Sequence, residues 1–248
     1  MKISIITVTF HSADSLPVTI ESLLMQQFQD KPELEYLVID GGSADKTVEV
    51  AESYRDRLEQ LGFTVHIQSE PDNGIYDAMN KGIRLATGDV IGILNSGDWY
   101  EPDTLQVVED TFHDTDCDLM YANIRIHKKN GTSFLKKAGT RKYETSRDWN
   151  HPTTFVKAAL YKNYPFANLG IHDDYAFFLK MKKQNRQIQI VDKVLANFQM
   201  GGASNQRSLK AMRKRVRDRY VYCYRANGYS RWYLLECLAI EVAKFLLG

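Results

Sequence analysis

An α/β fold, with a mostly parallel, Rossmann-like sheet and helices on both faces, is predicted by three features of the sequence. Apolar runs of strand length alternate with stretches of helical periodicity over residues 1–120. These runs are apolar throughout, as in strands that are buried on both faces. The chain has 248 residues, 44% of them hydrophobic, and its 32 Lys and Arg nearly balance 31 Asp and Glu. A disordered chain is therefore excluded.

The elements of this array follow one another in a regular order. Strands are expected over residues 3–10, 36–40, 63–68, 90–95 and 118–123. The helices between them are expected over residues 16–27, 45–61, 76–86 and 102–112. Ser43 is suited to cap the second helix, Gly62 to end it, and Pro102 to the first turn of the fourth. Ligands bind beyond the carboxyl ends of such strands, so the site is expected just after the first, second and fourth strands.

The second half is less regular and ends in helices. A hairpin is expected over residues 121–137, because Asn130-Gly131 is a favoured two-residue turn. The remaining elements are expected as a helix over 174–184, strands over 187–191 and 194–199, a glycine turn at 201–202, and helices from about residue 208 with a break near 227–228.

Charge and cysteine content suggest a two-part molecule in a reducing compartment. Residues 207–231 hold nine Lys or Arg and a single acid, Asp218, which leaves the rest of the chain acidic. The three cysteines are too few and too scattered for a disulfide framework or a Cys-based zinc site, so a cytoplasmic protein is expected. Residues 1–10 contain hydroxyls and precede no small-residue cleavage site, so they are expected to form a strand rather than a signal peptide.

The segment Asp40-Gly41-Gly42-Ser43 places a carboxylate at the end of a buried strand. A carboxylate there can accept hydrogen bonds from a base or a ribose, and the two glycines let a ligand approach the backbone. An ordinary turn with Ser43 as the helix cap explains the segment equally well. The chain has no Gly-x-Gly-x-x-Gly after its first strand and no Gly-Lys-Ser/Thr phosphate loop, which disfavours a dinucleotide-dependent enzyme.

Two other acidic segments could do chemistry. Residues 95–98 (Asn-Ser-Gly-Asp) end the fourth strand, and Asp98 could hold Mg²⁺ or Mn²⁺, which take oxygen ligands from carboxylates and substrate phosphates. Residues 172–175 (His-Asp-Asp-Tyr) precede an apolar helix and could supply a general base. The plain alternatives are a turn before a helix for the first segment and helix capping for the second. His151 is a lone histidine, which is more often structural than catalytic.

These segments occur in a fixed order with three others. The others are Glu-Pro-Asp-Asn-Gly-Ile-Tyr-Asp-Ala-Met-Asn-Lys-Gly at residues 70–82, Ala-Thr-Gly-Asp at 86–89 and Gly-Gly-Ala-Ser at 201–204. The ordered series resembles the family-two glycosyltransferases of GT-A fold, over roughly residues 2–204. The likeness is closest to the branch that builds colanic-acid-type exopolysaccharides and O-antigens.

The resemblance implies transfer of a sugar, with inversion, from a nucleotide-diphosphate sugar to an acceptor hydroxyl. In the family, the acid that matches Asp174 is the catalytic base and the acid that matches Asp98 binds the metal, Mn²⁺ or Mg²⁺. Asp173 is expected to support the base, and His151 to lie on the acceptor side. The residues that are expected to bind the nucleotide sugar, with Asp40 on its base, are Thr7, Val8, Thr9, Phe10, Asp40, Gly42, Asp72, Asn73, Asp77, Lys81, Asn95, Ser96 and Gly97. The family's metal motif usually holds two carboxylates, whereas Asn-Ser-Gly-Asp holds one.

Residues 1–205 are expected to form the catalytic domain, with a nucleotide-binding half over 1–100 and an acceptor-binding half over 101–205. Two other functions fit parts of the sequence. A nucleotidyltransferase, or another nucleotide-handling enzyme, would need a glycine- and Lys/Arg-rich phosphate loop after the first strand, and residues 11–14 do not provide one. A non-enzymatic module could bind nucleic acid through the basic tail. Both rank below the transferase, so no nucleic-acid partner is expected.

Residues 206–248 are expected to form a basic, amphipathic helical extension. No stretch of it reaches the ~20 apolar residues that are needed to span a bilayer. A helical projection opposes Glu236, Glu241 and Lys244 to an apolar face. That face consists of Leu234, Leu235, Leu238, Val242, Phe245 and Leu246. The aromatic residues suited to lipid headgroups are Tyr220, Tyr222, Tyr224, Tyr229, Trp232 and Tyr233.

The extension is therefore expected to lie on the inner face of the cytoplasmic membrane, as a peripheral contact. Five cations between Arg213 and Arg219 can meet anionic lipid. A lipid-linked acceptor, usual for the enzymes that the chain resembles, favours this interpretation. The alternative is that the apolar face packs on the catalytic domain or on a second copy of the chain, as in a homo-oligomer.

Overall fold

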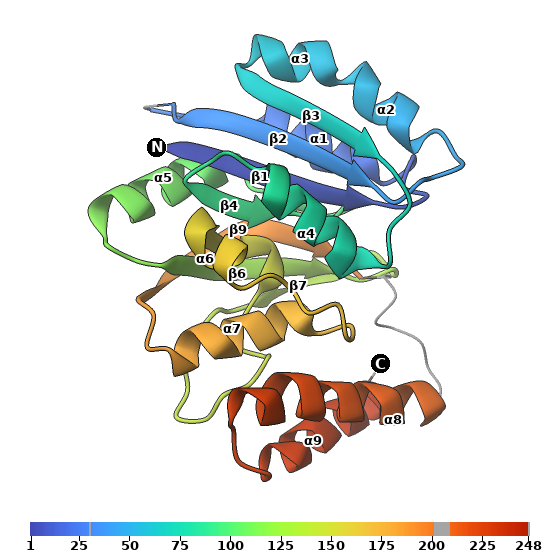
Figure 1. Ribbon diagram of the computed structural model, residues 1–248, viewed down its shortest axis with the longest axis vertical. Helices are drawn as coiled ribbons and strands as arrows, with labels where there is room; N and C mark the ends of the chain where they lie inside the picture. The colour runs from blue at the N-terminus through green and yellow to red at the C-terminus, as the bar shows by residue number, and fades with distance from the viewer. Residues whose placement is uncertain (30, 201–208, 248) are drawn as a thin grey trace.

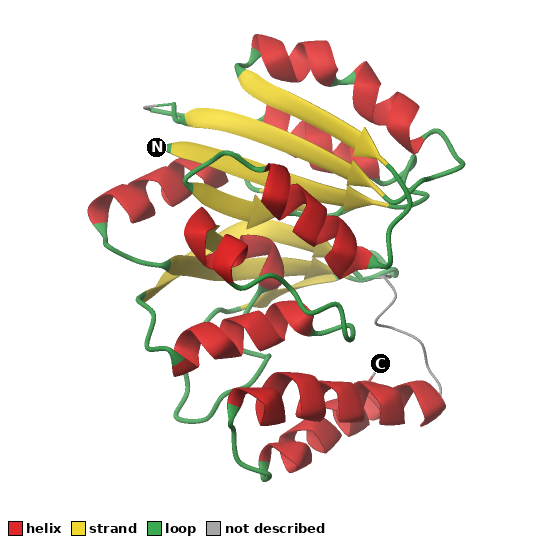
Figure 2. Ribbon diagram, in the orientation of Figure 1, coloured by secondary structure: helices red, strands yellow, loops and turns green. Residues whose placement is uncertain are grey.

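A nine-stranded sheet runs through the part of the chain that the computed structural model describes, residues 1–29, 31–200 and 209–247 (Figures 1 and 2). The strand order is β3-β2-β1-β4-β8-β6-β9-β5, and β7 pairs with β6. The strands are β1 (Lys2–Thr9), β2 (Glu33–Asp40), β3 (Phe63–Ser69), β4 (Val90–Ile93), β5 (Trp99–Tyr100), β6 (Leu119–His127), β7 (Ser133–Lys136), β8 (Phe155–Lys157) and β9 (Ile188–Gln199).

The parallel array predicted for the first four strands is confirmed. β1 pairs in parallel with β2 and β4, and β2 pairs in parallel with β3. This pairing places Thr9 beside Asp40 and brings the carboxyl ends of β1, β2 and β4 to one edge of the sheet. Beyond β4 the sheet is mixed, because β8 lies antiparallel between β4 and β6, whereas β6 and β9 are parallel.

Three strands differ from the prediction. β5 and β8 were not predicted, because they contain only two and three residues and so short a run shows no period in the sequence. β9 is one strand where two were expected, because residues 192–193 form an irregularity in its pairing with β6 rather than a break. The predicted hairpin is confirmed as β6 and β7, which pair in antiparallel fashion around the Asn130-Gly131 turn.

Helices cover both faces of the sheet, each through an apolar stripe. Leu16, Ile20 and Leu23 of α1 point into the core on one face, and Tyr76 and Met79 of α4 into the core on the other. The helices of the first face are α1 (Leu16–Leu24), α2 (Thr47–Ser53), α3 (Arg55–Gln60) and α5 (Thr104–Asp114). The helices of the second face are α4 (Ile75–Leu85), the 3₁₀ helix η1 (His151–Thr153), α6 (Ala158–Asn163) and α7 (Asp173–Lys183).

The helix expected over residues 45–61 is two helices that meet at Tyr54, and Gly62 follows the second as predicted. Ser43 does not cap it, because α2 begins only at Thr47 and the Ser43 hydroxyl donates to Asp40 instead. Pro102 precedes α5 and lies outside its first turn, since that helix begins at Thr104. The two helix-start predictions were therefore wrong.

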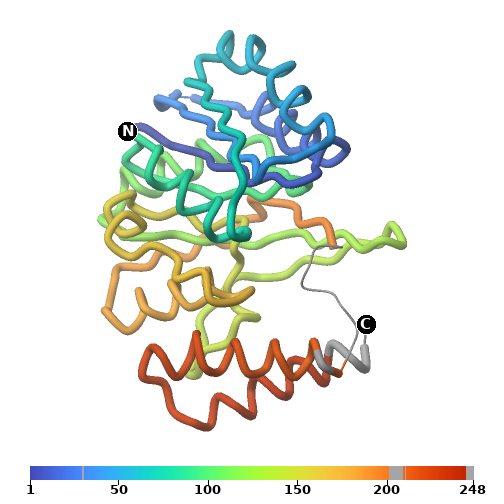
Figure 3. Tube along the Cα trace, turned by 45° about the vertical axis from the view of Figure 1, so that its right-hand side comes forward, coloured from blue at the N-terminus to red at the C-terminus, as the bar shows by residue number. Residues whose placement is uncertain are grey.

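The C-terminal helices pack against α7 and do not form a detached extension (Figure 3). They are α8 (Leu209–Asp218), the π-helix η3 (Arg219–Tyr224), the 3₁₀ helix η4 (Arg225–Asn227) and α9 (Tyr233–Leu247). Val216, Cys223, Tyr224 and Cys237 are buried in the same core cluster as the aromatic residues of α7. The expected break is present at Gly228, which has φ 71°. Removing everything after residue 205 would expose this core.

The glutamates of α9 face inward, opposite its exposed apolar residues. Glu241 is 1% exposed and lies 2.7 Å from Arg215, and Glu236 accepts hydrogen bonds from Thr145 and Tyr224. The exposed side of the helix is apolar, with the exposed residues Leu234, Leu235, Leu238 and Val242; the predicted Lys244, Phe245 and Leu246 have side chains outside the described ones. Protein contacts hold the charged side, so the apolar side is left to face outward.

Only some of the basic and aromatic residues that were predicted to face the membrane are exposed. Arg215 and Arg219 pair with Glu241, so three of the five predicted cations, Arg213, Lys214 and Arg217, are exposed. Tyr224 is fully buried, and Tyr220, Tyr229 and Tyr233 pack against the core cluster, whereas Trp232 is 69% exposed. None of the described helices is both long enough and apolar enough to cross a bilayer.

Candidate active site

The candidate site lies where β1, β2 and β4 end, at the edge that binds ligands in parallel α/β sheets. Three predicted segments, residues 7–10, 40–43 and 95–98, lie at or just after the ends of these strands. The fourth, residues 72–81, forms the loop after β3 and the first part of α4. Thr7, Val8 and Thr9 are buried within β1, and only Phe10, at 62% exposure, extends beyond the strand. The predicted strand-end wall is therefore represented at the surface by Phe10.

Asp40 is buried beneath this edge of the sheet, and protein hydrogen-bond donors surround its carboxylate. It accepts five hydrogen bonds: from the Thr9, Ser43 and Ser69 hydroxyls and from the backbone N–H groups of Gly42 and Ser43. Burial opposes ionisation, but the hydrogen bonds from Ser43, Ser69 and Thr9 outweigh it and hold the pKa of Asp40 below its usual range. Because the side chain is 1% exposed, its place in the structure is that of a residue that shapes the turn.

Asp72 and Phe10 flank the backbone of Gly41. A Cβ added at Gly41 would lie 2.4 Å from Asp72 Oδ2 and 3.3 Å from the Phe10 ring, so only glycine permits this approach. Asp72 Oδ1 accepts a hydrogen bond from the N–H of Gly74 at 2.8 Å, which leaves Oδ2 directed at the glycine. Asp72 is thus the carboxylate that lies over the exposed part of the turn.

The other predicted residues of segment 70–82 hold the loop before α4. Asp77 accepts a hydrogen bond from the N–H of Asn73 at 2.9 Å. Lys81 donates to the carbonyl of Pro71 at 2.8 Å and lies 2.9 Å from the carboxylate of Glu70. These contacts give the loop a defined shape next to Asp72.

Asp98 is a buried carboxylate with little compensation. It is 4% exposed, and among the described residues only the N–H of Gln199 donates to it, at 3.1 Å. Burial raises its pKa from 3.8 to about 7. In the same turn, Asn95 Oδ1 is buried and accepts no hydrogen bond from a described residue. Ser96 and Gly97 bond to Ser15 and Thr19 of the α1 region, which fixes the turn.

This turn has the donor set that suits a hard cation. A bound Mn²⁺ or Mg²⁺ ion would stabilise the ionised form of the buried Asp98 carboxylate. It would also give a partner to the Asn95 amide oxygen in the same turn. The described residues contain no group of three His, Cys, Asp or Glu that could hold a metal. Such an ion would therefore take its remaining ligands from substrate phosphate and water, as Mg²⁺ commonly does.

Asp174 lies in the first turn of α7, held from three sides. Its Oδ1 accepts hydrogen bonds from the Tyr76 hydroxyl and the N–H of Tyr175, both at 2.8 Å. Its Oδ2 lies 3.3 Å from Nδ1 of His151, and the carboxylate keeps 19% exposure. His151 thus contacts the predicted base directly. Tyr76 lies within the segment quoted for the family resemblance, but no sequence pattern distinguished it from its neighbours there.

Asp173 is more buried than Asp174 and has different hydrogen-bond partners. It is 4% exposed and accepts a hydrogen bond from the N–H of Leu169 at 2.7 Å. Burial raises its pKa. The carboxylate therefore orders the loop that leads into α7, and supports the base only by fixing the start of that helix.

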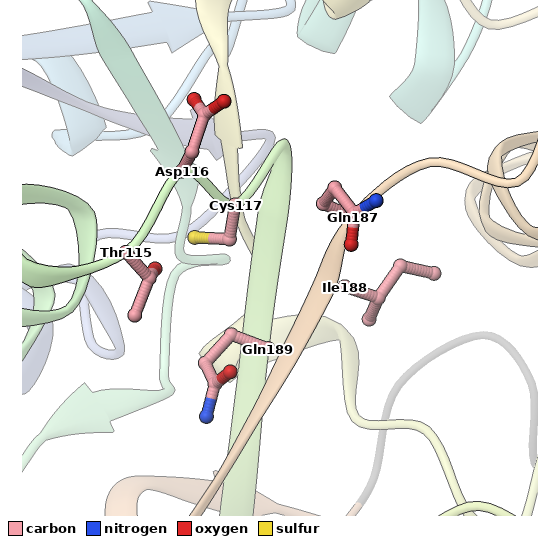
Figure 4. A pocket seen from close by; sticks show the side chains of 6 residues that line it. All are labelled: Thr115, Asp116, Cys117, Gln187, Ile188 and Gln189. Atoms are coloured by element: carbon pink, nitrogen blue, oxygen red, sulfur yellow. The ribbon is translucent and has the colours of Figure 1, made fainter.

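One open cavity, of about 270 Å³, lies away from these residues (Figure 4). It is found where β6 and β9 begin, whereas the candidate site lies where β1, β2 and β4 end. Its lining residues are Thr115, Asp116, Cys117, Gln187, Ile188 and Gln189. It contains none of the residues predicted from the sequence.

Curated relatives match part of the chain. An uncharacterized glycosyltransferase of Mycobacterium tuberculosis is 42% identical over 109 residues, which are 43% of this chain and 38% of the relative. A PGL/p-HBAD biosynthesis glycosyltransferase of Mycobacterium bovis is 35% identical over 129 residues, which are 51% and 48% of the two chains. The matches thus span less than half the length of these relatives.

Solved structures share the fold over almost the whole chain. Staphylococcus aureus TarS 1–349, in complex with UDP-GlcNAc, has a TM-score of 0.64 at 21% identity, over 100% of this chain and 73% of TarS. The mannosyltransferase PcManGT of Pyrobaculum calidifontis, in complex with GDP-Man and Mn²⁺, has a TM-score of 0.65 at 16% identity, over 99% and 74%. The predicted GT-A fold is confirmed.

The family model for "Glycosyl transferase family 2" matches residues 4–172, well over half of the chain. That range includes the donor-side segments and the Asp98 turn, and it ends just before α7. The chain belongs to glycosyl transferase family 2.

Proposed function

We propose that this protein transfers a sugar, with inversion, from a nucleotide-diphosphate sugar to an acceptor hydroxyl, with Mn²⁺ or Mg²⁺ bound at Asp98. The observation that supports this proposal is a pair of carboxylates with opposite surroundings. Asp98 is buried with one hydrogen bond, whereas Asp174 is partly exposed, accepts two hydrogen bonds and lies 3.3 Å from Nδ1 of His151. The first suits a cation and the second suits a base.

In the proposed reaction, the acceptor oxygen bonds to the anomeric carbon of the sugar as the bond from that carbon to the diphosphate breaks. Asp174 takes the proton of the acceptor hydroxyl, which is a poor nucleophile until it loses that proton. Asp98, with Asn95 Oδ1, would hold the divalent ion, which stabilises negative charge on the departing diphosphate when it is bound. One in-line displacement inverts the anomeric centre and needs no carboxylate nucleophile.

We further propose a role in cell-surface polysaccharide synthesis, of the exopolysaccharide or O-antigen type. The sequence resemblance supports this context, and one relative is named for PGL/p-HBAD biosynthesis. UDP-GlcNAc and GDP-Man, with which the two solved neighbours are in complex, are the first sugar donors to test.

The sugar-donor site can be tested through Asp72. Asp72→Asn is expected to weaken binding of the preferred nucleotide sugar about tenfold or more, because it removes a charged hydrogen-bond acceptor from the exposed turn. Its melting temperature should stay at the wild-type value, since asparagine keeps an oxygen for the Gly74 N–H. Asp40→Ala is expected to weaken binding and also to lower the melting temperature, because five hydrogen bonds lose their acceptor.

Calorimetry with UDP-GlcNAc and GDP-mannose, each with Mn²⁺, measures these affinities. Asp56→Asn, which removes an exposed charge on α3, is the matched control. Wild-type affinity in Asp72→Asn would remove Asp72 from the sugar-donor site. No binding of any nucleotide sugar by the wild-type protein would contradict the proposed function itself.

We also propose that the exposed side of α9 lies on an anionic membrane surface and brings the enzyme to a lipid-linked acceptor. Leu235 and Trp232 are 58% and 69% exposed, and Arg213, Lys214 and Arg217 are exposed on the neighbouring α8. Apolar side chains next to cations match the chemistry of an anionic bilayer surface.

Wild-type protein is expected to co-sediment with vesicles that contain phosphatidylglycerol, at low salt more than at high salt. Leu235→Glu/Leu238→Glu should remain in the supernatant, whereas the control Val18→Glu/Leu61→Glu, which changes two exposed apolar residues elsewhere, should sediment like the wild type. Point variants are needed because a 1–205 truncation would expose the core on α7. A dimer in solution that only the α9 variant dissociates would show that a second copy covers this face.

A further inference from the structure

The two oxygens of Asp174 are contacted by side chains from two separate elements. Tyr76, in the first turn of α4, donates its hydroxyl to Oδ1 at 2.8 Å. His151, at the start of η1, places Nδ1 3.3 Å from Oδ2. Both side chains are largely buried: Tyr76 is 4% exposed as a residue, and the side chain of His151 is 12% exposed.

Tyr76 donates a hydrogen bond to Asp174, whereas His151 faces the carboxylate as a polar contact. Burial raises the pKa of Tyr76 well above its usual value of 10, so its hydroxyl keeps its proton. Burial lowers the pKa of His151, so its imidazole is neutral and carries one proton. His151 Nε2 is buried with no partner among the described residues. A proton on Nδ1, facing Asp174, therefore avoids a buried donor without an acceptor.

We propose that Tyr76 and His151 are positioning residues that hold the Asp174 carboxylate in the orientation in which it receives the acceptor's proton. This inference rests on the proposed function, in which Asp174 is the base. The proton moves from the acceptor hydroxyl to Asp174, the acceptor oxygen bonds to the anomeric carbon, and the diphosphate leaves with the electrons of the broken bond. Tyr76 and His151 keep their own protons throughout.

The surrounding contacts show why Tyr76 can hold a base on another helix. Asn80, one turn further along α4, accepts from the N–H of Phe166 at 2.9 Å and donates to its carbonyl at 2.8 Å. Asn168 donates to the carbonyl of Asn73 at 3.0 Å. The loop before α7 is thus tied to the segment that contains Asp72. One segment of chain therefore shapes the sugar-donor side and fixes the base, which fits the need for correct placement of both reactants.

The test measures release of UDP from UDP-GlcNAc and of GDP from GDP-mannose, with Mn²⁺ and with water in place of the acceptor. Tyr76→Phe is expected to lower kcat about tenfold or more, the effect of one lost hydrogen bond to a charged group. His151→Ala is expected to lower kcat as well, because it removes the polar contact with Oδ2, and KM for the sugar donor should stay within about twofold in both variants. His151→Asn, which keeps a polar side chain beside Oδ2, should recover most of the rate. Tyr121→Phe is the matched control, because it removes a buried tyrosine hydroxyl that bonds to Gly139 and not to Asp174.

A double-mutant cycle separates this role from a general effect on folding. In the Asp174→Asn background, Tyr76→Phe should lower kcat no further, because it acts through the missing carboxylate. Wild-type kcat in both Tyr76→Phe and His151→Ala, with an inactive Asp174→Asn, would overturn the inference and leave the proposed function intact. A further loss in the Asp174→Asn background would also overturn it. An Asp174→Asn variant as active as the wild type would instead contradict the proposed base.

Discussion

Replacement of Asp174 by asparagine lowers kcat by at least about 100-fold, the lower range for removal of a general base, while the sugar donor still binds. Binding persists because Asp174 contacts Tyr76, Tyr175 and His151 and lies apart from the Asp98 turn in the chain. Steady-state kinetics with the preferred nucleotide sugar and Mn²⁺, together with calorimetry, measure the two effects separately.

Asp173→Asn is the control for this variant. Asparagine keeps an oxygen for the N–H of Leu169, so the melting temperature and kcat should both stay near the wild-type values. A retained rate in Asp174→Asn with a collapse in Asp173→Asn would move the base by one residue.

Asp98→Asn is expected to abolish metal-dependent turnover and to stabilise the metal-free protein at alkaline pH. The pKa of Asp98 is about 7 in the folded protein, against an ordinary value of 3.8. Between these values the folded state holds one proton more than the unfolded state, so the free energy of unfolding falls as pH rises through this window. The wild-type protein carries the full cost above about pH 7, and asparagine avoids it.

The effect should be large enough to measure by melting. Each pKa unit corresponds to about 1.4 kcal/mol, and each kcal/mol to about 2–4 °C for a chain of this size, so a rise of several degrees is expected at pH 8 and little difference below pH 4. Mn²⁺ should raise the melting temperature of the wild-type protein at pH 8 and leave Asp98→Asn unchanged. Parallel pH profiles for the two proteins in EDTA, or full activity in excess EDTA, would leave Asp98 as a turn residue.

The fold was predictable where the hydrophobic pattern of a segment shows its secondary structure. β1, β2 and β4 are almost wholly buried and mostly apolar, β3 begins with alternating buried and exposed residues, and α1 and α4 show clear apolar stripes, so the positions of these elements follow from the sequence. β5 and β8 are too short to show a period. The partners of the α9 glutamates could not be predicted, because Arg215 and Thr145 are distant from them in sequence.

The sequence yields a set of candidate site residues, whereas their geometry comes only from the tertiary structure. The family resemblance points to Asp98 and Asp174, but only the tertiary structure shows that Asp40 is occupied by five hydrogen bonds and that Asp72 lies over Gly41. Tyr76 was missed as a site residue, since its contact with Asp174 joins two helices 98 residues apart. Hydrogen bonds between distant side chains leave no periodic signal in a sequence.

The anomeric form of the released sugar tests the proposed function most directly. Wild-type protein is incubated with Mn²⁺ and the α-linked UDP-GlcNAc or GDP-mannose, and the first product is followed by proton NMR before it mutarotates. The proposed single displacement predicts that the β anomer is released first, and that Asp98→Asn and Asp174→Asn release none above background. Initial release of the α anomer, or release at the wild-type rate by either variant, would contradict inversion with Asp174 as base and a metal at Asp98.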